Sequence, residues 1–215
     1  MSGVKIMRLT VVINTCALGP RATETTSATN GAVYAARRYA LGNFILSAYL
    51  EDDFISEVIV VGEWCEGEGY TYIHSPSRYF SSDDATAQRE AAAQAATGDI
   101  IVFQHDDHIL HPKAAKELVM TEMNGADVLV LPRFVRSRLG DLTKPNGSGA
   151  TPPYIGGHCA AYTRDAISRV PWRAVPAIRE WDQAQTMLMR ASGLKISWPT
   201  NTPRVYDCEV GAQAL

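Results

Sequence analysis

The order of apolar and polar positions along the chain predicts strands that alternate with helices. Short runs of β-branched residues are typical of strands buried on both faces, and apolar residues repeated every three or four positions are typical of helices. The predicted strands are 9–13, 58–61, 70–73, 99–103 and 128–131, and the predicted helices are 30–50, 81–96 and 112–125. This order of elements favours a mostly parallel sheet with right-handed crossovers.

The alternation changes after Leu131. Residues 133–153 are rich in Gly, Pro, Ser, Asn and basic residues but lack periodicity, which predicts a long loop. The elements predicted after it are a strand at 160–162, helices at 164–170 and 180–192, and a strand at 195–198. The polar tail from Pro199 is expected to form an edge or a lid.

The length of 215 residues suits one domain that buries its own core and folds without a disulfide or a metal. No apolar run approaches the roughly 18–20 residues of a membrane span. Asn14 and Thr15 end the first apolar run, which favours a buried strand over a signal peptide. The cysteines are Cys16, Cys65, Cys159 and Cys208. They form no C-x-x-C pair, which predicts reduced thiols in a cytoplasmic protein.

The net charge of −3 conceals an uneven distribution of charged residues. Residues 1–129 contain 9 Lys and Arg against 17 Asp and Glu, a net charge of −8. Residues 130–180, here called the basic segment, contain 8 against 3, a net charge of +5. This polarity leaves two interpretations open: scattered solvated arginines, or a region that binds an anion.

Three common catalytic motifs are absent from the sequence. No G-x-G-x-x-G follows the first predicted strand, and no G-x-x-x-x-G-K-[ST] is present, which disfavours dinucleotide binding and P-loop chemistry. No G-x-S-x-G is present, which disfavours the usual hydrolase elbow.

The strongest candidate for a site is Gln-His-Asp-Asp-His at 104–108. It follows a predicted strand, and open α/β sheets bind ligands beyond the carboxyl ends of their strands. Burying so many ionisable side chains without a partner cation is costly, and carboxylates with imidazoles suit Mn²⁺ or Mg²⁺ on a diphosphate. A polar loop exposed to water is the alternative.

Several segments follow one another in a familiar order. They are Thr-Val-Val-Ile-Asn-Thr at 10–15, Glu-Val-Ile-Val-Val-Gly-Glu at 57–63, Arg89 in a helix, and the Gly-Asp strand with its acidic end at 98–107. This order resembles the nucleotide-sugar half of family 2 glycosyltransferases of the GT-A fold. Gly-Gly-His-Cys-Ala-Ala-Tyr at 156–162 and Arg-Glu-Trp-Asp at 179–182 are similar to that family's acceptor-side Gly-rich segment and its Glu-Asp-Trp helix start.

The resemblance implies an α/β fold of the GT-A type. A mostly parallel central sheet would carry flanking helices and a small acceptor-side extension. The chain would be a single GT-A-like domain over 1–215, in which 8–125 form the nucleotide-sugar-binding half and 126–215 the acceptor-side half.

The resemblance also implies which residues bind the donor. Thr15 and Glu63, at the ends of the first two strands, match positions that bind the nucleoside. Arg89 matches the helix arginine of the donor site, with a surface salt-bridge arginine as the alternative. His105 and Asp106 are expected to contact the donor as well.

The acidic motif departs from the family pattern. His105 stands where the first acid of Asp-x-Asp is usual, and His108 stands at the last position of the usual quartet. Asp107 matches the acid that ligates the metal, so the resemblance implies Mn²⁺ or Mg²⁺ at Asp107 with His105 as a second ligand. A later histidine that often completes the metal shell is missing, which leaves Asp207 or His158 as its replacement.

Glu180 matches the general base that takes the proton of the acceptor hydroxyl in inverting transfer. Arg179 stands where the family usually has Glu, and Asp182 is the alternative for the base. A carboxylate that only stabilises the start of a helix is the alternative explanation of Glu180.

Acceptor contacts are expected from two regions of the second half. The motifs imply Gly157, His158 and Trp181. Arg136 and Arg138 lie in the predicted loop, and their guanidinium groups suit an anionic acceptor.

We therefore expect a metal-dependent, inverting glycosyltransferase, a hexosyltransferase that uses a nucleotide sugar, with UDP-glucose as the default donor. Its acceptor would carry a hydroxyl group, and the basic segment leaves three anionic classes open: a nucleic acid, a phosphorylated polymer and, less favoured without a basic amphipathic helix, a lipid-linked phosphate. Alternatives are a DNA-modifying glycosyltransferase acting on hydroxymethylated bases and a catalytically weak nucleotide-sugar-binding protein. A nucleotidyltransferase is disfavoured, because no Gly-rich basic phosphate loop follows the first strand.

Overall fold

The computed structural model contains two sheets with helices packed against them. The structure describes residues 7–15, 43–62, 68–75, 82–106, 108–110, 112–118, 123, 125–131, 133–135, 155, 159–176, 181–198 and 205–207. The first strands are β1 (Leu9–Asn14), β2 (Glu57–Gly62), β3 (Thr71–His74), β4 (Ile100–His105) and β5 (His108–Leu110). The later strands are β6 (Val128–Val130), β7 (Arg133–Val135), β8 (Cys159–Thr163), β9 (Ile196–Ser197) and β10 (Val205–Asp207).

The described α-helices lie where the sequence predicts helices, with one difference in length, whereas the short 3-10 helix η2 was not predicted. They are α3 (Ser82–Ala95), α4 (Pro112–Glu117), α6 (Arg164–Arg169), the 3-10 helix η2 (Trp172–Ala174), α7 (Trp181–Ala191) and a helical segment at 43–50. The predicted helix from 112 to 125 is too long, because Met123 and Gly125 lie in turns. Gly125 has a φ of 89°, a left-handed conformation that does not continue a helix. Residues 30–42 of the first predicted helix lie outside the described residues.

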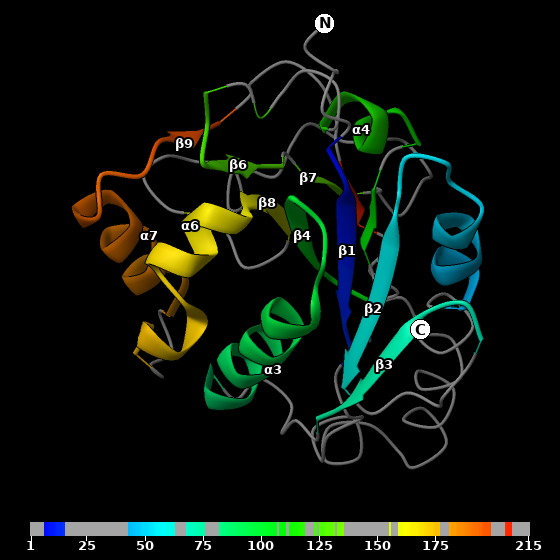
Figure 1. Ribbon diagram of the computed structural model, residues 1–215, viewed down its shortest axis with the longest axis horizontal. Helices are drawn as coiled ribbons and strands as arrows, with labels where there is room; N and C mark the ends of the chain where they lie inside the picture. The colour runs from blue at the N-terminus through cyan, green and yellow to red at the C-terminus, as the bar shows by residue number, and fades with distance from the viewer. Residues whose placement is uncertain are drawn as a thin grey trace, which may run out of the picture.

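The main sheet has seven strands in the order β3-β2-β1-β4-β8-β6-β9. Neighbours pair in parallel except around β8, which runs antiparallel to both β4 and β6. Figure 1 shows β1 between β2 and β4 in the middle of the sheet. The predicted α/β fold with a mostly parallel central sheet is confirmed, and every predicted strand is present.

A second sheet, β5-β10-β7, joins three short strands that the sequence did not reveal. β7 lies in the stretch predicted as a loop from 133, and β10 is the central strand of this sheet although the tail was expected to form an edge or a lid. Each strand has three residues, which is too short for an alternating pattern to stand out.

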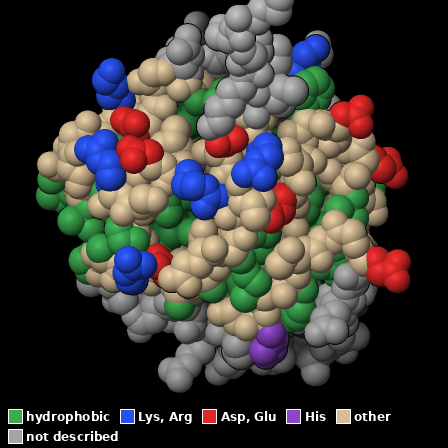
Figure 2. Space-filling view, viewed as in Figure 1, with side chains coloured by type: hydrophobic (Ala, Val, Ile, Leu, Met, Phe, Trp, Pro, Cys, Tyr) green, Lys and Arg blue, Asp and Glu red, His purple; other side chains and the backbone are tan. Residues whose placement is uncertain are grey.

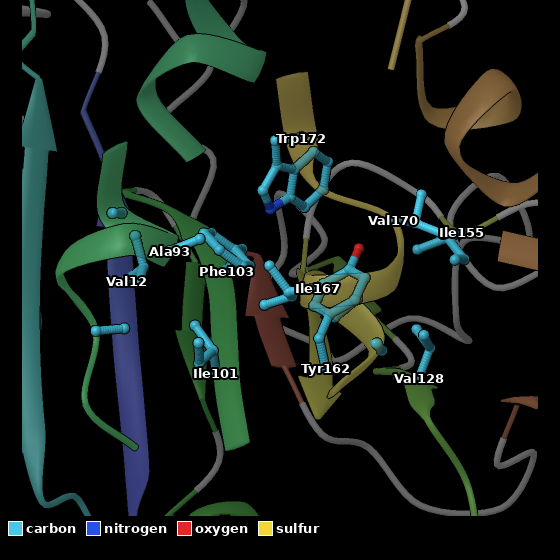
Figure 3. Close-up of a cluster of buried hydrophobic side chains, with 14 of the residues drawn as sticks. Val12, Ala93, Ile101, Phe103, Val128, Ile155, Tyr162, Ile167, Val170 and Trp172 are labelled. Carbon is cyan, nitrogen blue, oxygen red and sulfur yellow. The ribbon is translucent and has the colours of Figure 1, made fainter. Parts of the chain in front are cut away.

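Side chains along the central strands alternate between two hydrophobic layers. Val11 and Ile13 of β1 pack in one layer with residues of the segment 43–50 and of α4. Val12 of β1 and Phe103 of β4 point to the opposite layer, which α3, α6, η2 and α7 cover (Figure 3). The sheet is therefore covered on both faces, as the apolar runs of its strands require.

Aromatic rings fill the layer beneath α3 and α7. Phe103, Tyr162 and Trp172 meet in edge-to-face contacts, with ring centroids 5.3 to 5.7 Å apart (Figure 3). All three side chains are buried. This geometry is favoured by the charge distribution of aromatic rings and joins β4, β8 and η2.

Two arginines bind the C-terminal end of α3. Arg164 donates to the carbonyl oxygens of Ala96, at 2.6 Å, and Gly98, at 2.7 Å. Arg8 donates to the carbonyl oxygen of Thr97 at 2.6 Å. These three residues directly follow α3, so the guanidinium groups fix the chain where it leaves the helix and place positive charge near the negative end of the helix dipole.

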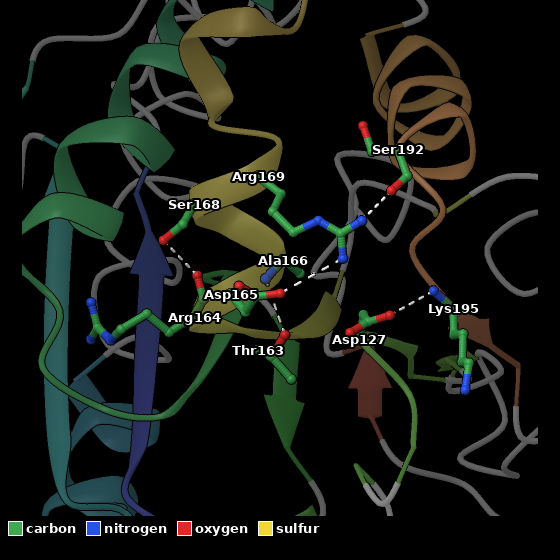
Figure 4. Close-up of polar contacts among 9 residues, drawn as sticks. All are labelled: Asp127, Thr163, Arg164, Asp165, Ala166, Ser168, Arg169, Ser192 and Lys195. Atoms are coloured by element: carbon green, nitrogen blue, oxygen red, sulfur yellow. Dashed lines mark hydrogen bonds and ion pairs between the residues drawn. The ribbon is translucent and has the colours of Figure 1, made fainter.

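Other arginines of the basic segment also contact the chain itself. Arg169 of α6 pairs with Asp165 at 3.7 Å and donates to the carbonyl oxygen of Ser192 beyond α7 (Figure 4). Arg173 of η2 binds Glu90 of α3. Figure 2 shows basic and acidic side chains next to one another on the face in view. Arg164, Arg169 and Arg173 of the basic segment thus have intramolecular partners, while Arg136 and Arg138 lie outside the described residues.

Glu90 links α3 to η2 and has a lowered pKa. Partial burial raises the pKa of this carboxyl, but hydrogen bonds from the Arg173 backbone N–H and the Gln94 amide, together with the Arg173 charge, lower it further than burial raises it. Because the pKa is lower in the folded than in the unfolded chain, the ionised carboxylate stabilises the fold above the usual glutamate pKa. That stabilisation is lost as the pH falls through the folded pKa.

We expect Glu90→Gln to lower the free energy of unfolding at pH 7 by about 1 kcal/mol, since a charged acceptor of three hydrogen bonds is lost. The difference from the wild type should be smaller at pH 3 than at pH 7, because the stabilisation by the ionised carboxylate is lost as the pH falls. Urea denaturation at both pH values measures this. Asp165→Asn is the matched control, because its ion pair is exposed and should contribute little. Equal losses at pH 7 and pH 3 would contradict the prediction.

Candidate functional site

The candidate site lies where β1 and β4 end. The chain runs outward from β1 to β3 and returns to β4 on the other side of β1, so the strand order reverses between β1 and β4. Open α/β sheets bind ligands beyond the carboxyl ends of strands at such a reversal. Asn14 and His105 are register partners there, and the Asp106 N–H donates to the Asn14 carbonyl oxygen at 3.2 Å.

A buried glutamine of α3 holds the strand ends together. The Gln88 side-chain amide donates to the carbonyl oxygens of Ser75, at 2.9 Å, and Thr15, at 3.4 Å. Its own oxygen accepts from the Asn14 amide at 3.4 Å. The other amide atom of Asn14, Oδ1, is buried without a hydrogen-bond partner among the described residues. Sequence reasoning missed both residues, although Asn14 ends an apolar run and Gln88 precedes Arg89.

Thr15, predicted to bind the nucleoside, is buried against the end of β2. Its backbone N–H donates to the Val61 carbonyl oxygen at 2.9 Å, and its hydroxyl donates to the same oxygen at 3.2 Å. A Cβ at Gly62 would lie 1.9 Å from the Thr15 Oγ1, so only glycine fits there, with a φ of 140°. Contact of Thr15 with a nucleoside stays a prediction, and Glu63 lies outside the described residues.

Hydrogen bonds of the Tyr49 side chain hold the turn after β4 in place. The Tyr49 hydroxyl donates to the Gln104 side-chain oxygen at 2.8 Å and accepts from the Leu110 N–H at 2.7 Å. The Gln104 amide donates to the His108 carbonyl oxygen at 2.8 Å. Gln104 is buried by these contacts and therefore shapes the turn from inside the protein.

The ionisable residues of this turn differ in exposure. Asp106 and His108 are buried, whereas His105 is half-buried. The rings of His105 and His108 lie 5.8 Å apart. Asp207, one of the two replacements expected for the missing histidine, stands opposite His108 in the β5–β10 pairing. Asp107 and His158 lie outside the described residues.

The donor set at this turn suits a divalent cation in its chemistry. Imidazole and carboxylate groups bind Mn²⁺ and Mg²⁺, and His105 is the accessible imidazole. Within the described residues, no three His, Cys, Asp or Glu side chains lie close enough to hold a metal. A third ligand would therefore have to come from outside the described residues, where Asp107, the ligand that the resemblance implies, also lies.

Arg89, predicted to bind the donor, is buried inside the protein. Only 2% of this residue is exposed, so the alternative of a surface salt bridge is wrong. Its guanidinium carbon lies 4.5 Å from the ring centre of Trp181, 5.0 Å from that of Trp172 and 5.8 Å from that of Phe103. A cation within about 6 Å of such ring centres is attracted by the rings. Contact with a donor stays a prediction.

The start of α7 brings a predicted acceptor residue to Arg89. Trp181 is half-buried and its ring lies 5.9 Å from that of Trp172. Asp182, the alternative catalytic base, follows in the first turn, where its carboxylate accepts from the Gln183 N–H at 2.8 Å. Glu180, the first choice for the base, lies outside the described residues.

The buried side of α7 anchors the segment before the Gly-rich motif. The Thr186 hydroxyl donates to the Asp182 carbonyl oxygen and accepts from the Ile155 N–H, both at 2.8 Å. Gln185 accepts from the Tyr162 hydroxyl at 3.4 Å. Gly157, like its neighbour His158, lies outside the described residues.

Among the described residues, no helix has both the length and the apolar character needed to cross a membrane.

No known protein family and no curated protein matches this chain in sequence. Its structure is similar to that of mannosyltransferase PcManGT from Pyrobaculum calidifontis in complex with GDP-Man and Mn²⁺. The TM-score is 0.59 and the identity 15%, over 97% of this chain and 59% of that chain. It is also similar to S. aureus TarS 1-349, with a TM-score of 0.58 and 14% identity over 93% of this chain and 60% of that chain.

The same TarS fragment in complex with UDP-GlcNAc gives a TM-score of 0.55 at 14% identity, over 93% of this chain and 58% of that chain. The chain thus spans about three-fifths of the length of the solved structures it matches. These likenesses confirm the predicted fold class: the chain has the GT-A type fold found in these glycosyltransferases.

Proposed function

We propose that the chain is a glycosyltransferase, a hexosyltransferase that moves a sugar from a nucleotide sugar to an acceptor hydroxyl with inversion. The observation that carries the proposal is the meeting of β1 and β4, where polar residues gather at the reversal of strand order. Two proteins of the same fold, whose complexes contain GDP-Man with Mn²⁺ and UDP-GlcNAc, support a nucleotide-sugar donor.

The donor diphosphate is proposed to lie over the turn after β4. His105 and Asp107 would hold Mn²⁺ or Mg²⁺ there. The ion supplies positive charge that stabilises the diphosphate as it leaves. The first half of the chain carries a net charge of −8, so a diphosphate bound there needs such a cation.

The acceptor side contributes a base. A carboxylate at the start of α7, Glu180 or Asp182, would take the proton of the acceptor hydroxyl. The hydroxyl oxygen then forms a bond to the anomeric carbon while the bond from that carbon to the diphosphate breaks. A base within hydrogen-bond reach typically contributes about 10²–10⁴-fold to such a step.

A panel of labelled nucleotide sugars with Mn²⁺ tests the proposal. UDP-glucose is the first donor, and GDP-mannose and UDP-GlcNAc follow because proteins of the same fold were solved with them. We expect transfer or donor hydrolysis with one of them, abolished by chelator and by Asp107→Ala with folding intact. Binding without turnover would favour the catalytically weak binding protein. Cleavage of the donor only when pyrophosphate is added, giving a nucleoside triphosphate and a sugar 1-phosphate, would favour a nucleotidyltransferase.

We expect Glu180→Gln to lower kcat by about 10²-fold or more with little change in donor affinity, since glutamine keeps the shape but cannot accept the proton. Asp182→Asn is the matched variant for the alternative base. Steady-state kinetics and calorimetric donor titration separate the two effects. A lowered melting temperature with normal kcat would instead assign Glu180 to stabilising the helix start.

The acceptor is proposed to be anionic because Arg136 and Arg138 lie in the basic segment. For a nucleic-acid acceptor, affinity should fall by roughly 0.7–0.9 log units per log unit of salt for each neutralised phosphate. Replacing both arginines with Gln should flatten that slope without changing donor binding. Acceptor KM against salt measures it, using duplex DNA with hydroxymethylated bases, a phosphorylated polysaccharide and a lipid phosphate. A KM independent of salt would favour a neutral sugar acceptor.

A further inference from the structure

Arg89 stands where the two halves of the chain meet. It belongs to α3, in the half expected to bind the nucleotide sugar, yet two of its three aromatic neighbours come from the other half. Trp172 lies in η2, and Trp181 is the first residue of α7. The shortest of the three cation–ring distances, 4.5 Å, is the one to Trp181.

The burial of Arg89 limits what its guanidinium can touch. With 2% of the residue exposed, its N–H groups do not face a ligand in solution, as a diphosphate contact would need. A planar guanidinium stacks on aromatic faces in a way that a compact ammonium does not. The contact with Trp181 therefore depends on the shape of Arg89 as well as on its charge.

We propose that Arg89 is a positioning residue, which holds the first turn of α7 in place through Trp181 and does not bind the donor. The inference rests on the proposed function, because the first turn of α7 matters for transfer only if a carboxylate there acts as the base. Trp181 stands between Glu180 and Asp182 in the sequence, so a shift of the backbone at Trp181 would displace either candidate. A displacement of about 1 Å can cost about 10²-fold in rate.

The other end of α7 supplies a matched control. Arg190, in the last turn, lies over the ring of Trp198 with a cation–ring distance of 5.4 Å. Arg190→Met removes the same kind of contact from the same helix, far from the first turn. Its effect measures what the loss of any arginine–tryptophan contact does to α7.

Hydrogen exchange of the unliganded full chain tests the positioning without any need for activity. The amides of 185–188 bond to carbonyls in the first turn of α7, so their exchange reports on that turn. We expect Arg89→Lys, Arg89→Met and Trp181→Leu to raise their exchange rates by about tenfold, with the amides of β4 unchanged. Arg190→Met should leave the amides of 185–188 unchanged.

Kinetics then separate positioning from donor binding. With the donor that the wild type turns over, Arg89→Lys and Arg89→Met should each lower kcat by about tenfold or more while the donor dissociation constant changes less than twofold. Lysine keeps the charge and also binds phosphate, so a donor-binding Arg89 would instead lose less donor affinity on replacement by lysine than by methionine. After Trp181→Leu, Arg89→Lys should have little further effect on kcat.

Two results would overturn the positioning role. One is unchanged exchange at 185–188 in both Arg89 variants. The other is donor affinity lowered more than tenfold in Arg89→Met and restored in Arg89→Lys, with kcat at saturating donor preserved. If the wild type turns over no nucleotide sugar, the proposed function fails, and the exchange measurement alone decides whether Arg89 positions α7.

Discussion

The parallel pairing of β1 with β4 is the constraint on which the rest of the arrangement depends. It runs without a break from Leu9 opposite Ile100 to Asn14 opposite His105, and both strands are buried on their two faces. Because β2 and β3 occupy the other side of β1, the chain must return across the sheet through α3 to reach β4. That return places Gln88 above the strand ends, where it bonds both Asn14 and the Thr15 carbonyl. The polar edge is thus a consequence of the topology.

The sequence predicts the central strands well because each is a run of apolar residues buried on both faces, a local signal that needs no knowledge of neighbours. It does not predict the second sheet. The three-residue strands β5, β7 and β10 exist because they pair with one another, and their partners lie far apart in the chain. The helix predicted from 112 to 125 is too long for a different reason, because Gly125 has a left-handed conformation that does not continue a helix. Pairing between distant strands is decided by tertiary contacts, which local patterns do not record.

In the candidate site, too, the sequence predicts some features and misses others. The sequence places His105 and Asp106 at a strand end, and the structure has them there. For Arg89 the sequence predicts a position on a helix but does not predict that the side chain is buried. Its burial depends on Trp172 and Trp181, which arrive from elements that follow far along the chain. The supporting amides of Asn14 and Gln88 escape prediction because neither residue type carries a chemical signature. Their importance comes only from the groups they meet.

Among the described residues, the uneven charge along the sequence corresponds to contacts between the two parts of the chain. The front half supplies carboxylates and helix-end carbonyls, and the basic segment supplies the guanidinium groups that bind them: Arg164 at the end of α3, and Arg173 at Glu90. Arg89 makes the opposite kind of contact: its cation belongs to the first half of the chain, and the Trp172 and Trp181 rings belong to the second half. All three contacts involve α3. The helix that ties down the strand ends through Gln88 is therefore the helix against which η2 and α7 are set, and a movement of α3 would change both sides of the proposed site together.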